Sequence, residues 1–550
     1  MADLLYEGRR QPLAVGRSLL EQATDMSVPV PVSCRRSGRC RECVVQVLAG
    51  SAALTPGTTA EAFLPDGFRL ACQAVVERDQ ADVAFALVRR RLRILVDTPQ
   101  GTDNAADREA APAVVRRGPH VVRDGEVLGP APDRLVGLAL DIGTTSVVAE
   151  LVDLESTQRL ATIAFENPQR FGGSDVVSRI AYEAQHPGEL RRALRRALNR
   201  ELAGAYSGLG LERHAVMEAV VAGNPTMRDL FFGLDVAPLG RWPFRSVSET
   251  ASADGSRRTG VTRRAHEVGL LIHPRASVVG LPLVGSHVGA DIAADLVATR
   301  FAEHDGVSLL MDIGTNSELV LSDGKRILAA SAPAGPAFEG GGVGCGMAGA
   351  DGAIESIAWL GNGFGWRTIG DQPPQGICGS GLVDLLAEAT RGHLLQRDGT
   401  FADGTTVINV VPGTRIALTR ADASALAQAK AANLVGQQVL LRRLGIDPVQ
   451  VDRIFLAGAF ANRIDVRHAM QIGLLLSVPP ARVRRVGNAS LLGARMLLLS
   501  HWRRAALGDL VSRIEHVELE TEPDFFELFV EACRFEPAST LPQWPQSARS

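Results

Sequence analysis

The sequence predicts a multidomain α/β protein, and three observations lead to this fold class. The chain has 550 residues, enough for roughly three or four domains. Hydrophobic residues make up 46% of it and charged residues 22%, which excludes a chain that is disordered throughout. From Leu135 onward, short apolar runs alternate with helical patterns, as they do in α/β sheets. We therefore expect several α/β units joined along one chain.

The overall charge and the apolar runs exclude some classes of partner. The 58 Lys and Arg residues against 61 Asp and Glu residues give a net charge of −3, so no overall field favours nucleic acid or an anionic membrane. No apolar run reaches the length of about 18 residues that predicts a transmembrane helix. The first residues, MADLLYEGRR, lack the features of a signal peptide. We expect a cytoplasmic protein that binds neither nucleic acid nor a membrane.

Four of the seven cysteines lie in a small first domain, which we place at residues 1–95. The odd number of cysteines argues against a disulfide framework. Cys34, Cys40 and Cys43 follow the spacing C-x5-C-x2-C, and Cys72 comes after 28 further residues. Three thiolates on one tight loop and a fourth from a distant segment suit an iron–sulfur cluster or a tetrahedral metal ion.

This cysteine pattern resembles that of the 2Fe–2S ferredoxins. The surroundings match as well, with SLLEQA before the loop, CVVQV beginning at its last cysteine, and RLACQ around Cys72. The resemblance implies a β-grasp domain whose four cysteines hold a 2Fe–2S cluster. Structural zinc is the alternative, and it is less favoured because zinc sites usually contain two C-x2-C pairs, whereas this chain has one.

Four arginines stand among the three cysteines of the loop: Arg35, Arg36, Arg39 and Arg41. They are either solvated surface charge or a patch that guides an acidic partner to the electron exit. The sequence leaves both interpretations open.

Residues 96–134 predict a linker. The segment contains PQGTDNAADREAAPA and is rich in Pro, Gly, Ala and charged residues, with little periodicity. Two short apolar runs in its second half could pair as a hairpin, but we expect no core there. Such a composition is typical of a flexible tether, so the first domain is expected to change position relative to the rest of the chain.

An internal duplication follows the linker. LVGLALDIGTTSVVAELVD (135–153) and LLMDIGTNSELVL (309–321) share the tetrapeptide Asp-Ile-Gly-Thr between apolar runs. A turn of this kind between two strands suits the phosphates of a nucleotide, because glycine permits close approach, threonine and backbone N–H groups contact phosphate oxygens, and aspartate holds Mg²⁺ through water. The residues assigned to these roles are Asp141, Gly143, Thr144 and Thr145 in the first turn and Asp312, Gly314, Thr315 and Asn316 in the second. Two ordinary hairpins are the alternative interpretation.

The paired turns resemble those of the superfamily of acetate and sugar kinases, heat-shock chaperones and actin. The resemblance implies a duplicated actin-like ATPase fold that holds ATP and Mg²⁺ between a first subdomain at 135–304 and a second at 305–537, followed by a tail at 538–550. RIFLAGAF (453–460) is similar to the adenosine-contacting motif of that superfamily, which places Gly458 under the nucleotide.

Two glycine-rich segments fit the same cleft, namely 333–355 and 376–389. Their cysteines, Cys345 and Cys378, are expected to be small packing residues rather than redox thiols.

A 2Fe–2S domain fused to an actin-like cleft resembles the reductive activators of corrinoid proteins, including those of corrinoid-dependent methyltransferases. The matching landmarks include NPQRFGGSDVVSRIAY (167–182), VVAGNPTMRDLFFG (220–233) and HVGADIAADL (287–296). Two departures from the family pattern stand out. The linker is short, which argues against a separate helical middle domain, and Pro225 takes the place of an expected threonine.

The resemblance implies an ATP-hydrolysing iron–sulfur activase that reduces a corrinoid protein of a methyltransferase system from Co(II) to Co(I). Its cofactors would be a 2Fe–2S cluster, ATP and Mg²⁺. Its partners would be the corrinoid protein and a low-potential electron donor. The corrinoid would belong to the partner, because the cobalt-ligating motif Asp-x-His-x-x-Gly is absent from this sequence. The sequence assigns no catalytic residue, and a homodimer is one of the oligomeric states left open.

Two alternatives come from other functional classes. A redox-regulated small-molecule kinase predicts a phosphorylated acceptor and a catalytic carboxylate in the cleft. A nucleotide-gated binding scaffold predicts a structural cluster and no turnover.

Overall fold

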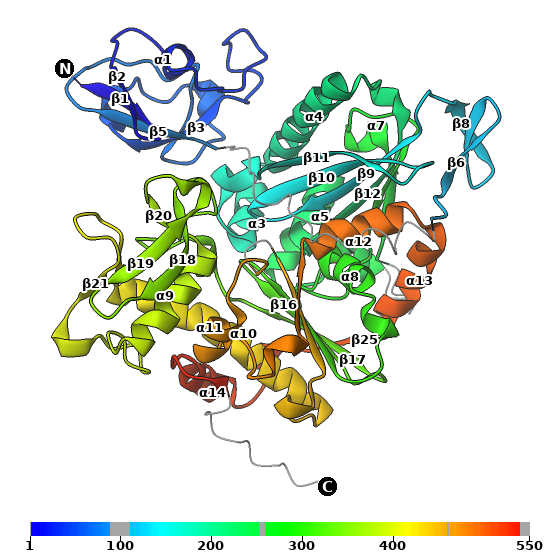
Figure 1. Cartoon of the computed structure of the whole chain (residues 1–550). Coiled ribbons are helices and arrows are strands. Elements are labelled where there is room, and N and C mark those ends of the chain that lie inside the picture. The colour runs from blue at the N-terminus through cyan, green and yellow to red at the C-terminus, as the bar shows by residue number, and fades with distance from the viewer. Residues whose placement is uncertain (1, 89–109, 252–258, 459–460, 539–550) are drawn as a thin grey trace.

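The computed structural model describes residues 2–88, 110–251, 259–458 and 461–538. Figure 1 shows a small N-terminal domain in blue, a first lobe that follows it along the chain in cyan and green, and a second lobe that runs from green to red. The predicted fold class is confirmed, since all three parts combine sheets and helices. No helix in these ranges is long and apolar enough to cross a membrane.

The N-terminal domain is a five-stranded mixed sheet in the order β2-β1-β5-β3-β4 with one helix. Its elements are β1 (Asp3–Tyr6), β2 (Arg9–Pro12), α1 (Leu19–Asp25), β3 (Val44–Ala49), β4 (Phe68–Leu70) and β5 (Val83–Leu87). β1 and β5 pair in parallel, and the other neighbours are antiparallel. Ser18 and Glu21 form a capping box that starts α1. The predicted β-grasp arrangement is present.

A three-stranded antiparallel sheet lies within the segment predicted as a linker. Its strands are β6 (Val114–Arg117), β7 (His120–Arg123) and β8 (Glu126–Pro130). Val114, Val121 and Leu128 are buried and belong to the same apolar cluster as the first lobe's β9 strand. The structure therefore differs from the expected coreless linker over 114–130, because these short strands bury their side chains against a neighbouring lobe. Residues 89–109 of the expected linker lie outside the described residues.

The first lobe contains a six-stranded sheet in the order β11-β10-β9-β12-β14-β13. Its strands are β9 (Val136–Ile142), β10 (Ser146–Asp153), β11 (Arg159–Glu166), β12 (Val216–Gly223), β13 (Val261–Arg264) and β14 (Ser277–Gly280). Its helices are α3 (Val176–Gln185), α4 (Glu189–Leu209), α5 (Pro225–Phe232), α6 (Val247–Ala251), α7 (Ala265–Val268) and α8 (Ala290–Ala298). The first Asp-Ile-Gly-Thr turn joins β9 to β10.

The second lobe repeats this pattern in a sheet of order β24-β23-β15-β16-β17-β25. Its strands are β15 (Ser308–Ile313), β16 (Ser317–Ser322), β17 (Ile327–Ala332), β23 (Arg453–Ala457), β24 (Val483–Gly487) and β25 (Ile514–His516). In each lobe, three antiparallel strands are followed by a strand that pairs in parallel with the first, β12 with β9 and β23 with β15. The duplicated sequence thus corresponds to a duplicated fold.

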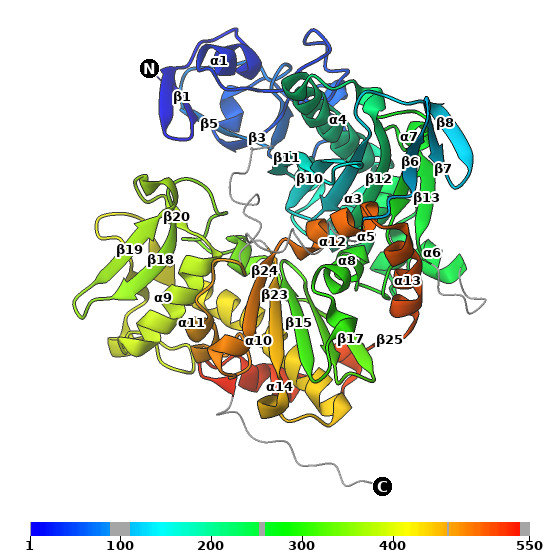
Figure 2. The same ribbon diagram turned by 45° about the vertical axis from the view of Figure 1, so that its right-hand side comes forward.

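Smaller sheets and further helices complete the part of the chain that follows the first lobe. The strands are β18 (Ala353–Trp359), β19 (Phe364–Thr368), β20 (Gly376–Ile377), β21 (Val407–Asn409) and β22 (Ala417–Thr419). The helices are α9 (Gly379–Arg391), α10 (Arg420–Leu444), α11 (Val466–Gln471), α12 (Ala489–Leu498), α13 (His501–Ser512) and α14 (Phe525–Ala532). Figure 2 shows α9, β18 and β19 projecting from one side of the main sheet of this lobe.

Two helices join the lobes at the centre of the molecule. α8 of the first lobe and α12, which follows β24, pack together within one apolar cluster that spans both sheets, and α12 also packs on β9 and β12 of the first lobe. A side chain at Gly493 would place its Cβ 2.0 Å from the Ala294 carbonyl oxygen, so this close crossing requires glycine.

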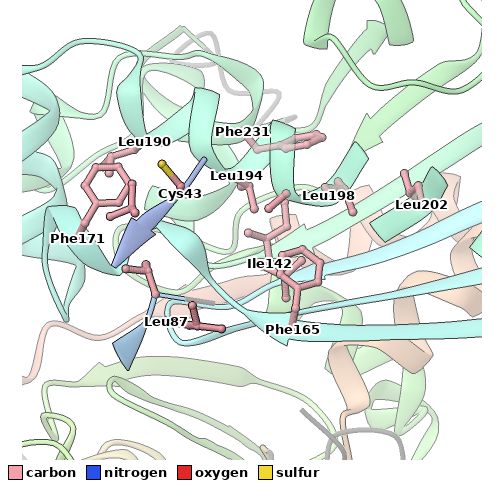
Figure 3. Packing of buried hydrophobic residues seen from close by; sticks show 14 of the residues in the cluster. Cys43, Leu87, Ile142, Phe165, Phe171, Leu190, Leu194, Leu198, Leu202 and Phe231 are labelled. Atoms are coloured by element: carbon pink, nitrogen blue, oxygen red, sulfur yellow. The ribbon is translucent and has the colours of Figure 1, made fainter. Parts of the chain in front are cut away.

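The N-terminal domain packs on the first lobe. Figure 2 shows it beside α4, and Figure 3 shows Cys43 close to Leu190 and Leu194 of that helix. These residues belong to one cluster of buried side chains that continues from the N-terminal sheet into the first lobe.

Candidate functional site

The four N-terminal cysteines come together at the edge of the small domain. Cys34, Cys40 and Cys43 lie on the loop between α1 and β3, and Cys72 lies two residues after β4. Hydrogen bonds link the thiols in pairs, Cys34 with Cys40 and Cys43 with Cys72. The bond from Cys43 lowers the pKa of Cys72 to about 6, which favours the thiolate.

The backbone around these thiols suits a buried anionic group. Arg35, Arg36 and Arg41 adopt positive φ angles of 51°, 67° and 54°, so the loop turns tightly. Backbone N–H groups of Gly38 and Ser37 donate to the cysteine sulfurs. Four thiols surrounded by N–H donors are the arrangement that iron–sulfur clusters use. The residues present therefore fit a 2Fe–2S cluster.

The cluster loop is held on α4 by charged contacts. Arg196 donates to the backbone carbonyl of Cys40, and Arg41 pairs with Glu189 at the first turn of the helix. Cys40 and Cys43 are buried on this side, whereas Cys34 is only half-buried. The loop's open side is therefore the one that carries Cys34.

Both Asp-Ile-Gly-Thr turns line one cavity of about 250 Å³ between the lobes. All nine residues assigned to nucleotide binding surround it: Asp141, Gly143, Thr144, Thr145, Asp312, Gly314, Thr315, Asn316 and Gly458. The cysteines lie in a different domain, so the structure divides the candidate residues into two sites.

The aspartates of the turns are buried and close to other acids. Burial raises the pKa of Asp141 to about 6, although Asn488 and Ser490 donate hydrogen bonds of 2.9 and 3.1 Å to its carboxylate. Burial and the charges of Asp291 and Asp141 raise the pKa of Asp312 to about 8. A bound cation would relieve this repulsion, so the donor set fits Mg²⁺ coordinated through water. Among the described residues, however, no three acidic, histidine or cysteine side chains are grouped closely enough to hold a single metal ion directly. The four cysteines are included in this finding, and a 2Fe–2S cluster needs only two thiolates on each iron.

Two glycines fit the phosphate-binding arrangement. Gly458 has a φ of +101°, and a Cβ there would lie 2.5 Å from the Ile313 carbonyl oxygen, so only glycine brings β23 this close to the second turn. Residues 459 and 460 of the adenosine motif lie outside the described part. A Cβ at Gly143 would lie 2.9 Å from the Ser146 carbonyl oxygen, which keeps the first turn tight.

Pro225, which departs from the expected motif, starts α5 as its first residue. The preceding residue, Asn224, caps this helix and donates a 3.0 Å hydrogen bond to the Thr144 hydroxyl. The contact between this segment and the first turn is therefore made by Asn224.

Sequence reasoning missed several acids of the cleft. Glu339 accepts hydrogen bonds from the hydroxyls of Thr145 and Thr315, at 2.6 and 3.0 Å, and so spans the two turns. Asp291 lines the cavity from α8, and the buried Asp295 carboxylate has no hydrogen-bond partner within the described part of the chain. The only signal for Glu339 was its position inside the glycine-rich segment 333–355.

Comparisons with known proteins match every part of this architecture. The family model of the 2Fe-2S iron-sulfur cluster binding domain matches residues 6–77, and that of the RACo middle region matches residues 136–304. The model of the C-terminal domain of RACo, the ASKHA domain, matches residues 306–546. The middle region thus corresponds to the first lobe of the cleft.

Two relatives and one solved structure are similar over most of the chain. The corrinoid activation enzyme RamQ of Eubacterium limosum is 32% identical over 424 residues, which are 72% of this chain and 70% of RamQ. The [Co(II) methylated amine-specific corrinoid protein] reductase of Methanosarcina barkeri is 25% identical over 430 residues, 72% of this chain and 76% of the reductase. A solved reductive activator for a corrinoid, iron-sulfur protein is 28% identical with a TM-score of 0.70, covering 98% of this chain and 99% of its own.

Proposed function

The chain belongs to the RACo family of reductive activators, and on this premise we propose that it restores the Co(I) state of a corrinoid protein in an ATP-dependent reaction. The kinase and scaffold alternatives are not favoured, because both relatives are named for corrinoid activation or reduction. The observation that carries the proposal is the packing of the four-cysteine domain, through the loop that bears Cys34, Cys40 and Cys43, on the lobe that bears the first Asp-Ile-Gly-Thr turn.

The N-terminal domain serves the electron step. Cys34, Cys40, Cys43 and Cys72 would hold the 2Fe–2S cluster, which supplies one electron at a time when it is bound. Transfer of one electron would reduce the partner's Co(II) to Co(I). A low-potential donor would then return one electron to the N-terminal domain. The chain's contribution is to keep Cys40 and Cys43 buried while Cys34 and the exposed Arg35 and Arg39 face outward. Their positive charge attracts an acidic partner surface to the open side of the loop.

The cleft serves the ATP-dependent step. Asp141 and Asp312 would hold Mg²⁺ through water, and the threonine hydroxyls and N–H groups of both turns would bind phosphates. ATP, hydrolysed in this cleft, helps a redox step only by favouring one arrangement of the activator–corrinoid complex over another. For a one-electron transfer, a difference of about 59 mV in reduction potential changes the equilibrium constant tenfold, which is about 1.4 kcal/mol. A modest coupling energy therefore makes an uphill reduction feasible.

An anaerobic visible spectrum tests the proposal. The protein, a Co(II) corrinoid protein and a reductant are mixed with and without Mg-ATP, and the Co(I) absorption is followed. We expect Co(I) only when nucleotide and an intact cysteine set are both present. Formation of Co(I) at the same rate without nucleotide, or phosphorylation of a small-molecule acceptor instead, would contradict it.

A further inference from the structure

Six residues connect the first phosphate turn to the N-terminal domain. They form Asn167 and the 3₁₀ helix η4 (Pro168–Gly172), directly after β11. The backbone N–H of Asn167 donates 2.8 Å to the Thr145 carbonyl, and its side-chain amide donates 2.8 Å to the Gly143 carbonyl. Asn167 is 1% exposed, so it contacts these two backbone carbonyls of the turn from the interior of the lobe.

The far end of the same segment contacts the N-terminal domain. Phe171 is 3% exposed, and its ring packs edge-on against Phe63 of that domain, with ring centroids 5.9 Å apart. The side chain of Arg170 donates 3.2 Å to Gln46 on β3 and lies 3.7 Å from Glu166, an acid that lines the nucleotide cavity. Both ends of η4 are therefore fixed, one at the cleft and one at the small domain.

The contacts continue from Phe63 to the cysteines. The Arg41 guanidinium stacks on the Phe63 ring, 4.5 Å from its centroid, and Arg41 directly follows Cys40. Tyr182 packs edge-on against Phe171 and donates a hydrogen bond to the Phe63 carbonyl, so the Phe63 contact is held from two sides. An unbroken series of contacts thus joins the carbonyls of the phosphate turn to the backbone beside a cluster cysteine.

We propose that the segment Asn167–Phe171 positions the N-terminal domain according to the nucleotide state of the cleft. This inference rests on the proposed function, in which the turns bind phosphates. In the structure, the Thr145 hydroxyl donates to Glu339. A phosphate at the turn competes for this hydroxyl, so the turn changes partners while Asn167 remains attached to its carbonyls. The displacement passes along η4 to Phe63 and changes how firmly the small domain packs on the first lobe. Coupling of this kind is reciprocal, so the packing of the small domain also changes nucleotide affinity.

Amide hydrogen exchange of the intact, cluster-loaded chain tests the coupling. Exchange is followed in the segments around Cys40–Gln46 and Phe63, with and without a Mg-bound, non-hydrolysable ATP analogue. We expect the analogue to change exchange there by about fivefold or more, the size of typical site-to-site coupling. Asn167→Ala and Arg170→Ala should retain cluster absorbance and bind the analogue, but lose this dependence. Arg170 is partly exposed, so its variant remains informative if Asn167→Ala does not fold.

Two controls are needed. One tests whether loss of any partly exposed arginine would give the same result, and the other distinguishes failure of this inference from failure of the proposed function. Arg116→Ala removes another partly exposed arginine, which lies in the β6–β8 sheet and pairs with Glu155, and should keep the full response. The inference is overturned if the wild-type chain binds the analogue without any change in the small domain, or if Asn167→Ala and Arg170→Ala both respond normally. Failure of the wild-type chain to bind the analogue by calorimetry would overturn the proposed function as well.

Discussion

The hydroxyl of Thr145 donates a 2.6 Å hydrogen bond to the carboxylate of Glu339, which joins the first phosphate turn to the second lobe. The other carboxylate oxygen accepts a 3.0 Å bond from Thr315 in the second turn. The carboxylate therefore occupies the space between the two turns, where phosphate oxygens would bind. Each hydroxyl has one proton to donate, so on the proposed function a bound phosphate would compete with Glu339 for both of them.

We predict that Glu339→Gln tightens the binding of Mg-ATP. The amide oxygen can accept a bond from only one of the two hydroxyls and carries no charge that repels phosphate, so we expect affinity to rise by about tenfold, or about 1.4 kcal/mol. Isothermal titration calorimetry measures this directly. Glu303→Gln, an exposed acid outside the cleft, is the matched control and should leave affinity unchanged. Unchanged or weaker binding by Glu339→Gln would show that the carboxylate does not oppose phosphate.

Replacement of Asp312 tests the cation site. Asp312→Asn keeps the shape but cannot ionise when a cation binds, so we expect Mg-ATP affinity to fall by about tenfold or more, while affinity for Mg-free ATP falls little. Asp141→Asn should behave in the same way, whereas Asp371→Asn, on an exposed turn, should not. Calorimetry with and without Mg²⁺ gives both affinities. Normal ATP turnover in both cleft variants would refute the assignment of the turns.

The duplicated turns could be located from sequence because their chemistry is local. The same tetrapeptide between two apolar runs joins β9 to β10 and β15 to β16, so both copies could be recognised from sequence. No repeated motif identified Glu339, since its position matters only when two lobes face each other across a cleft. Asp291 and Asp295 were missed for the same reason, because on a helix they look like ordinary polar positions. The binding roles of the turn residues remain predictions.

The packing of the N-terminal domain on α4 could not be predicted either. The arginines of α4, including Arg196 and Arg200, have the pattern of a solvated helix face. Only the structure places them against the loop that bears Cys40. The burial of the sheet at β6–β8 could not be predicted for a related reason. Its apolar residues are too few for a core of their own, and they become buried only against a neighbouring lobe.

The cysteine assignment predicts the metal content of the protein. Cys40→Ser should abolish the visible absorbance of the cluster and corrinoid reduction, while ATP binding stays nearly intact because the cleft lies in another part of the chain. Cys345→Ser, a buried cysteine of the second lobe, is the control and should retain the cluster. Iron and zinc analysis of the purified wild-type protein completes the test. Stoichiometric zinc without iron would favour the structural zinc alternative.

The pair of His468 and Asp384 predicts a pH-dependent contribution to stability. His468 on α11 lies 2.7 Å from Asp384 and 3.3 Å from Glu388, both on α9. The hydrogen bond with Asp384 raises the pKa of His468 above its ordinary 6.5. Because the folded-state pKa is raised, the stabilisation is complete below about pH 6.5 and is lost as pH rises through the raised value.

His468→Gln should therefore destabilise the protein more at pH 6 than at pH 9. We expect a difference of the order of 1 kcal/mol, the size of a partly exposed charge-assisted hydrogen bond. Chemical denaturation of both proteins at the two pH values measures it. His266→Gln, an exposed histidine of the first lobe, should show no such difference. Equal destabilisation at both pH values would mean that the charge of His468 does not contribute.

A charge reversal tests whether the ion pair of Arg41 and Glu189 holds the small domain on the first lobe. Glu189→Arg places two positive groups together and should loosen the packing, which amide exchange around Cys40–Val44 reports as faster exchange. The added Arg41→Glu should restore slow exchange, because the pair is re-formed with its charges exchanged. A partly exposed pair contributes about 1 kcal/mol or less, so we expect up to about a fivefold change in local exchange. Additive effects of the two substitutions, without restoration, would show that this pair does not hold the domain, and the buried contact of Phe63 with Phe171 would then be the stronger attachment.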